Sequence, residues 1–473
     1  MVSWRENQAS SLASVTPVGN LAVMTAMLAA LVLAATWVLL FLDVDPVPTW
    51  FYVFAWYPVL VLADAAARRL GRMLTLFRSP TLVASLFGWS VVVWLVFEVA
   101  NFRLRNWYYV FLPAGGVERW AGIVISFATV IPAVVLAERL LNAMRVGHTW
   151  RTAPLTLRPR DLGMIQGIGL GMVALSLFVP QTFFPLIWGA AWLLADPIVF
   201  RHHPAWSLLG DLSRGDFGRV GRLMLGGLSI GLVWEFLNFW ARGRWVYTVP
   251  WLDGTKLFEM PPLGFLGFPF FALEAWALYH LLCVVGVAVP PDKGQEGKSS
   301  PRIVPPRLFT SGLAAAAFAV LTLIGMERWT ISSVTPEITR LPGVTASEAD
   351  IIADAGFESP FVLARVEASA LAARTGVASA RAAQLIETSR LVVLRGIGTV
   401  HAVRLDAIGV STVCALARRP PAVLWQAYHE GDELLPSVVR IPGPDRPTPA
   451  EARIWIGAAR RQCAERWEIG TDN

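Results

Sequence analysis

The chain has 473 residues, of which 55% are hydrophobic and only 16% are charged, and its mean hydropathy is +0.53. This composition excludes an ordinary soluble globular protein and predicts a multi-pass membrane protein, which we place in a bacterial cytoplasmic membrane. The net charge of +6 does not indicate a nucleic-acid partner, because residues 327–473 contain sixteen Arg, no Lys and seventeen acidic residues, so the positive excess lies in the apolar part.

Nine apolar runs are long enough to cross about 30 Å of hydrocarbon as helices. They cover residues 21–42, 51–66, 82–97, 120–137, 162–179, 183–199, 223–239, 265–289 and 309–326. The first run follows a leader with only Arg5 and Glu6 and is too long for the core of a signal peptide, so we interpret it as a retained anchor.

Arginine and lysine predict the orientation of these runs, because positive residues collect on the cytoplasmic side. They gather after the second, fourth, sixth and eighth runs, within residues 68–78, 139–160, 201–222 and 293–307. The opposite loops carry only Arg103, Arg105, Arg119, Arg242, Arg244 and Lys256. We therefore expect a cytoplasmic amino terminus and an extracytoplasmic C-terminal region; one run fewer would reverse the second expectation.

A polar signature occurs twice in the apolar region, as WLVFEVANFRLRNWYY at residues 94–109 and as WEFLNFWARGRWVY at residues 234–247. With one inserted residue in the second copy, the matching sets are Glu98, Asn101, Phe102, Arg105, Trp107 and Tyr109, and Glu235, Asn238, Phe239, Arg242, Trp245 and Tyr247. Apolar residues recur by chance in any membrane protein, whereas a repeated Glu, Asn and Arg indicates a site.

The duplication extends beyond the signature. The further matching pairs are Trp56 and Asp64 with Trp188 and Asp196, at equal separation, and more loosely Pro132 and Glu138 with Pro269 and Glu274. We expect an all-α fold in which residues 1–150 and 151–290 form two four-helix repeats. An even number of spans per repeat makes the repeats parallel, with both signatures at the outer face.

The signature predicts the site residues. Its Glu, Asn, Phe and Arg are spaced i, i+3, i+4 and i+7 and are expected on one helix face. A carboxylate at bilayer depth costs about 2.5–3.5 kcal/mol, which favours a functional role for Glu98 and Glu235 as catalytic acids. The expected substrate-binding residues are Asn101, Arg105, Trp107, Tyr109, Asn238, Arg242, Trp245 and Tyr247. Alternatively, the Glu and Arg residues seal helix ends, and Trp and Tyr form an interfacial belt.

Three further acidic residues are candidates. Glu274 lies near the centre of its run without a local cation, so burial would keep it protonated, and we predict it as a third catalytic acid that donates a proton. Asp64 and Asp196 are secondary acidic candidates, or else salt-bridged anchors at cytoplasmic span ends. The histidines and cysteines show no metal spacing, and we expect neither a metal nor a cofactor.

The second signature copy resembles the lycopene cyclase domain of carotenoid biosynthesis. The residues that carry the resemblance, over about forty positions, are Trp234, Glu235, Gly243, Trp245, Tyr247, Pro269 and Glu274. The resemblance implies a duplicated membrane bundle whose acidic residues protonate a polyene and stabilise a carbocation. The first copy lacks the Gly, and the adjacent acid pair typical of that family is missing after Pro269.

The C-terminal part is separated by a polar, Pro- and Gly-rich linker at residues 291–308, followed by a last span at 309–326 and a small α-helical domain at 327–473. In this domain LPGVTASEADIIADAGFESPFVLAR (341–365) aligns without gaps to LRGIGTVHAVRLDAIGVSTVCALAR (394–418). The region resembles tandem helix-hairpin-helix domains similar to the RNA polymerase alpha C-terminal domain. The matching turn glycines are Gly343, Gly356, Gly396, Gly398 and Gly409.

Helix-hairpin-helix units often bind DNA phosphates, but this domain is near neutral, lacks lysine and is expected to be extracytoplasmic. We therefore expect a protein partner. Cys414 and Cys463 could form a disulfide if the domain is exported, although we expect isolated buried thiols, as for Cys283.

Three functions fit these observations. The first is an enzyme or binder for a lipidic, isoprenoid-like substrate, with Glu235 and Glu274 as acids. The second is a secondary transporter in which Glu98 and Glu235 couple protons and Arg105 and Arg242 hold an anionic solute. The third is a membrane scaffold. Because only the second copy has the Gly-x-Trp spacing and a downstream Glu274, we expect it to be the working site.

Overall fold

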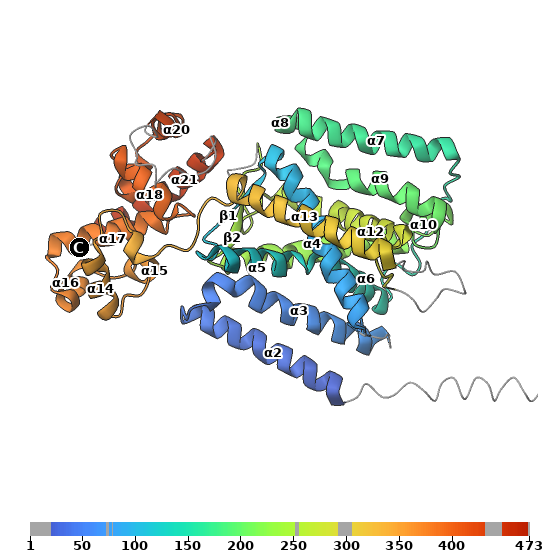
Figure 1. The fold of residues 1–473 in the computed structure, drawn as a ribbon, viewed down its shortest axis with the longest axis horizontal. Coiled ribbons are helices and arrows are strands. Elements are labelled where there is room, and N and C mark those ends of the chain that lie inside the picture. The colour runs from blue at the N-terminus through green and yellow to red at the C-terminus, as the bar shows by residue number, and fades with distance from the viewer. Residues whose placement is uncertain are drawn as a thin grey trace, which may run out of the picture.

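The computed structural model describes residues 20–71, 75–77, 79–250, 255–291, 305–430 and 447–471. Within these residues nine helical segments are long and apolar enough to cross a membrane, and they confirm the number and approximate positions of the predicted runs (Figure 1). The amino-terminal leader and most of the predicted linker, at 292–304, lie outside the described residues.

The two halves of the bundle contain corresponding elements. The first half consists of α2 (Asn20–Phe41), α3 (Val47–Gly71), α4 (Pro80–Leu104), β1 (Trp107–Val110), α5 (Gly116–Phe127) and α6 (Val130–Ala143). The second half consists of α7 (Pro159–Phe178), α8 (Pro180–Phe183), η1 (Phe184–Leu186), α9 (Ile187–His202), α10 (Leu208–Ser213), α11 (Gly218–Trp240), β2 (Arg244–Tyr247), η2 (Pro262–Leu266) and α12 (Gly267–Val285). A last long helix, α13 (Pro305–Trp329), packs against α4.

Helix packing repeats between the halves. Helix α2 packs on α3 as α7 packs on α9, and α3 packs on α6 as α9 packs on α12. Contacts between α6 and α11 join the halves. The shared core between them is rich in aromatic and branched side chains, including Phe51, Trp56, Leu95, Phe271 and Trp276.

The two strands are a feature that the all-α prediction missed. β1 and β2 pair antiparallel, with Trp107 opposite Tyr247 and Tyr109 opposite Trp245. Each strand follows the helix of its signature, because α4 ends where Arg105 adopts a left-handed conformation and α11 ends before an extended Ala241. Exchange of the two copies maps one of these pairs onto the other, as expected for a pseudo-twofold arrangement.

The C-terminal domain repeats its own architecture with the 53-residue period. Helix α14 (Ala346–Asp354) corresponds to α18 (Gly398–Ala407), and α15 (Pro360–Leu363) corresponds to α19 (Val413–Ala417). The short helices α15 and α19 are capped by Ser359 and Thr412. The five predicted turn glycines all have positive φ, a conformation that other residues rarely adopt. The remaining elements are η3 (Ile338–Arg340), α16 (Ala368–Thr375), α17 (Ser379–Val392), α20 (Pro421–Glu430) and α21 (Pro449–Thr471).

A disulfide corrects the expectation of isolated thiols. Cys414 and Cys463 are bonded and join α19 to α21, whereas Cys283 is buried in α12. The two sulfurs come together because both helices contribute to one core around Trp455 and Leu416. The 49-residue separation gave no sign of this proximity.

The C-terminal domain contacts the strand end of the bundle (Figure 1). The segment after α13 forms bridges with β1 and the residues after it, and the amide of Tyr109 donates to the carbonyl of Thr330 at 2.7 Å. Phe361 packs on Phe111, with ring centroids 5.2 Å apart, and lies under the Arg242 guanidinium. The domain therefore contacts β1, the residues that follow it, and Arg242 of the second signature.

Candidate functional site

The first signature surrounds its carboxylate with three donors. Oε1 of Glu98 accepts hydrogen bonds from the indole N–H groups of Trp94 and Trp107, each at 3.0 Å, and from the hydroxyl of Tyr109 at 2.5 Å. Trp107 and Tyr109 reach the carboxylate from β1, so the strand returns over the end of its own helix. Glu98 is fully buried and is not among the residues that line the main cavity.

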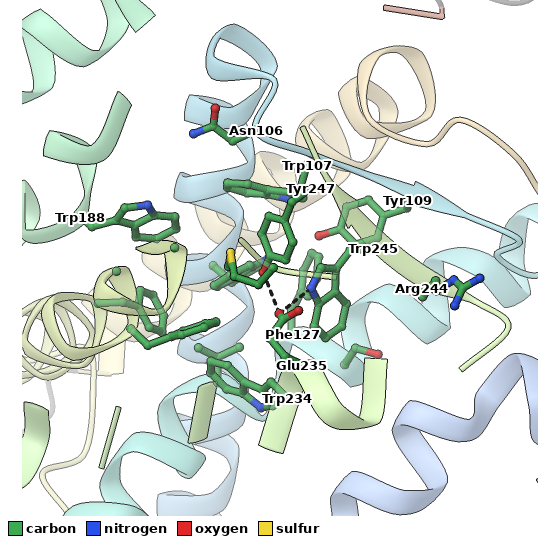
Figure 2. Close-up of a pocket in the computed structure, with 18 of the residues that line it drawn as sticks. Asn106, Trp107, Tyr109, Phe127, Trp188, Trp234, Glu235, Arg244, Trp245 and Tyr247 are labelled. Carbon is green, nitrogen blue, oxygen red and sulfur yellow. Dashed lines mark hydrogen bonds between the residues drawn. The ribbon is translucent and has the colours of Figure 1, made fainter. Parts of the chain in front are cut away.

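The second signature repeats this arrangement with two donors. Oε1 of Glu235 accepts from the indole N–H of Trp245 at 3.1 Å and from the hydroxyl of Tyr247 at 2.9 Å (Figure 2). Burial and then the charge of Glu235 raise the pKa of Tyr247 well above its ordinary range, so its hydroxyl remains a donor. Unlike Glu98, Glu235 contributes to the cavity wall.

The position four residues before each Glu explains the difference. In the first copy Trp94 occupies this position and donates to Glu98. In the second copy it is Gly231, where an added Cβ would collide with the ring of Phe268. The aromatic ring of α12 therefore fills this space, and the second carboxylate lacks the third donor.

The two asparagines hold the strands and do not face the cavity. The side-chain amide of Asn101 donates to the carbonyl of Trp107 at 2.9 Å and accepts from the amide of Asn106. Asn238 donates to the carbonyl of Trp245 at 2.9 Å and accepts from the same residue's amide at 3.0 Å. Both asparagines are fully buried. These hydrogen bonds hold the two strands in place. The sequence predicted that both asparagines contact a substrate.

The spacing predicted that the two arginines lie on the same helix face as the Glu and Asn. They do not, because both helices end before the arginines. Arg242 pairs with Asp43 at 2.7 Å and with Asp45 at 2.8 Å. The carbonyl of Arg105 accepts from the hydroxyl of Thr248 at 2.5 Å. Neither arginine lines the main cavity. The structure thus separates these side chains from the carboxylates with which the sequence grouped them.

Asp64 and Asp196 cap the turn that follows their helices. Asp64 accepts from the amide of Leu76 and the hydroxyl of Thr75, and Asp196 accepts from Leu208, Leu209 and Ser207 in the same way. These bonds to backbone amides, at the same separation in both copies, replace the predicted salt bridges. In the second copy they satisfy the first donors of α10, whereas in the first copy the donor Leu76 lies in the turn before α4.

Glu274 binds a break in a neighbouring helix. Trp188 and Gly189 interrupt α9 with non-helical backbone angles, and the amide of Ala191 donates to Oε1 of Glu274 at 2.8 Å. Glu274 is fully buried and is not a cavity-lining residue. Among the described residues the structure shows no ion pair to this carboxylate; its partner is a backbone amide just after the break in α9, and the start of a helix favours negative charge.

A cavity of about 650 Å³ lies between the two copies. Aromatic residues dominate its wall: Trp50, Trp94, Trp107, Trp188, Trp192, Trp234, Trp245, Tyr52, Tyr109, Tyr247, Phe127, Phe184, Phe268, Phe270 and Phe271 (Figure 2). Its wall includes Leu263 and Leu266 of η2, which are 62% and 61% exposed on the outside of the bundle. The cavity therefore borders an outward apolar surface.

The signature supplied only part of this wall. Trp107, Tyr109, Glu235, Trp245 and Tyr247 were predicted and line it. Most of the other aromatic residues come from α3, α5, α9 and α12, and sequence reasoning missed their role because tryptophan in an apolar run is ordinary core. The one indication for Trp188 in the sequence is that it matches Trp56 in the duplication.

Comparisons with known proteins identify the C-terminal domain alone. Residues 342–462 match a family described as a domain of unknown function (DUF4332). No curated protein and no solved structure matched the chain.

Proposed function

We propose that this protein is a multi-pass protein of a bacterial cytoplasmic membrane that takes a lipidic, isoprenoid-like substrate into the cavity beside Glu235. The observation that carries the proposal is the combination of an aromatic wall and one acidic side chain in a cavity of about 650 Å³. This volume lies within the range of small-molecule sites, about 300–1,000 Å³. An apolar chain would be buried against the rings, with Glu235 acting on one end of it.

The outward position of the cavity supports a substrate that arrives from the bilayer. Leu263, Leu266 and Phe270 line the cavity and are also exposed. An aqueous route for an anion has less support, because Arg242 is paired with two aspartates and Glu98 is enclosed. Glu235 is thus the proposed acid, and Glu98 its structural counterpart.

We also propose that the amino terminus is cytoplasmic and the C-terminal domain is extracytoplasmic. The loop arginines support this orientation, and so does the Cys414–Cys463 disulfide, because disulfides persist in oxidising compartments. Protease cleavage of a C-terminal epitope tag in intact spheroplasts would test it. Protection of the tag until the cells are lysed would contradict it.

For the C-terminal domain we propose a tandem helix-hairpin-helix module that docks a protein partner. The repeated helices and their five turn glycines support the resemblance. One of its surfaces already packs against the bundle through Phe361 and through the Arg395–Glu259 ion pair. The partner would therefore bind the faces that point away from the bundle.

The lipid proposal is tested by lipids that co-purify with the protein. We expect mass spectrometry of purified wild-type protein to show a lipid enriched over bulk membrane. Val53→Trp, which would fill the cavity from α3, should lose that lipid, whereas Val38→Trp on the exposed face of α2 should retain it. Equal lipid content in the wild type and in folded Val53→Trp protein would contradict the proposal.

A further inference from the structure

The cavity wall contains a carboxylate oxygen without a partner. Oε1 of Glu235 accepts two hydrogen bonds, but Oε2 accepts none within the part of the chain that the structure describes. The side chain is fully buried. An ionised carboxylate in such surroundings requires a compensating charge or a proton.

The basic residues of the wall are already engaged. Arg119 pairs with Glu327 at 2.7 Å and donates to the carbonyls of Pro113 and Ala114. Arg244 donates to the carbonyl of Phe239, and its guanidinium points away from the labelled aromatic residues (Figure 2). It lies 3.6 Å from Glu259, which also pairs with Arg395. These contacts leave the carboxylate at the wall without an ion pair among the described residues.

Two charged residues that do not line the cavity, Lys256 and Glu259, interact electrostatically with Glu235. Lys256 is positive and donates to the carbonyl of Tyr247 at 3.0 Å, whereas Glu259 is negative, so their effects on Glu235 oppose each other. The indole N–H groups of Trp192 and Trp234 lack acceptors within the described chain, but they are neutral. The compensating charge for Oε2 must therefore come from a proton or from the ligand.

The aromatic wall is suited to a positive ligand. Seven tryptophans, three tyrosines and five phenylalanines line the cavity. The faces of such rings attract cations, tryptophan most strongly. Among the lining residues that the structure describes, Glu235 is the single acidic one.

We propose that the ligand carries a positive charge, as a quaternary ammonium or protonated amine on an apolar chain, which is held between the rings and Oε2 of Glu235. This inference rests on the proposed function, since it specifies the charge of the lipidic molecule. The cation and a proton compete for the same carboxylate oxygen, because either one compensates its charge. Cation binding therefore releases a proton and strengthens as the pH rises.

The test compares two probes of nearly equal shape. Dodecyltrimethylammonium and 2,2-dimethyltetradecane differ in a nitrogen that replaces a carbon. Binding to the full chain in dodecyl maltoside is measured by tryptophan fluorescence, and proton release by calorimetry in buffers of different ionisation enthalpy. We expect wild-type protein to prefer the cation about tenfold or more, with tighter cation binding at higher pH.

Matched variants assign the preference to one carboxylate. Glu235→Gln should lose most of the preference and the proton release, whereas Glu235→Asp and Glu98→Gln should keep both. Melting curves and gel filtration identify variants that misfold, and proton release by wild-type protein keeps the test decisive if Glu235→Gln does not fold. Equal binding of both probes or absent proton release in wild-type protein, or the full preference in folded Glu235→Gln, overturns the inference. In that case a co-purifying lipid would still support the proposed function.

Discussion

The two signature copies differ in one residue that changes the environment of the carboxylate. Trp94 donates to Glu98 and completes a three-donor shell, whereas Gly231 leaves Glu235 with two donors, and Glu235 contributes to the cavity wall. The asparagine contacts are nearly identical in both copies. The comparison indicates that the two copies share the scaffold that holds the strands and differ in the third donor to the carboxylate, and that only the carboxylate with two donors belongs to a cavity-lining residue.

Removal of the carboxylates should show the largest difference. Glu98→Ala leaves three buried donors without an acceptor, so we expect a loss of about 3–5 kcal/mol in unfolding free energy. Glu235→Ala leaves two donors beside a cavity that can admit water and should cost about half as much. Denaturant unfolding in micelles measures both values. Equal losses would remove the distinction between the copies.

The asparagines should have equal effects, because their contacts match. Asn101→Ala and Asn238→Ala each remove the bonds that hold the start of a strand, and we expect a loss of about 2 kcal/mol in either case. The same unfolding measurement applies, with Ser229→Ala on the exposed face of α11 as a control. A loss confined to one copy would show that the strands are held differently.

The extra donor of the first copy can be removed alone. Trp94→Phe keeps an aromatic ring but lacks the indole N–H, so Glu98 loses one of three bonds. We expect a loss of about 1 kcal/mol in the unfolding free energy, measured in the same way. No loss in folded Trp94→Phe protein would show that the third donor does not contribute to the stability of the first copy.

The smallest change in stability is expected in the C-terminal domain. Its two hairpins, like the two signatures, differ in a residue at equivalent positions. Glu348 caps α14 through Thr345 and pairs with Arg381 at 2.9 Å, whereas the equivalent position in the second hairpin is His401. Hydrogen bonds from Arg381 and Thr345 lower the pKa of Glu348 to about 2. A lowered pKa stabilises the fold above the ordinary Glu value and loses that contribution as the pH falls toward 2.

We therefore expect the stability difference between wild type and Glu348→Gln to be small at pH 6 and to shrink further by pH 3, because the pair is close to solvent. Thermal unfolding of the full chain at both pH values measures it. A difference that grows on acidification would contradict the sign of the linkage.

Local patterns were sufficient for several features. The apolar runs located the nine helical segments, because burial in hydrocarbon depends on composition over one helix length. The turn glycines of the C-terminal domain all adopted positive φ, since that requirement is local to each turn. The matched polar residues identified two equivalent places on the chain.

Composition and repeated motifs were enough to predict an apolar, duplicated helical chain with a repeated polar signature and a small C-terminal domain. Four features became visible only in three dimensions: Trp107 and Tyr247 share a sheet, Cys414 is bonded to Cys463, Glu274 binds at a break in a helix, and Glu235 lines the cavity whereas Glu98 does not. Each of these depends on contacts between segments distant along the chain. Such contacts are set by packing, and no local periodicity specifies them.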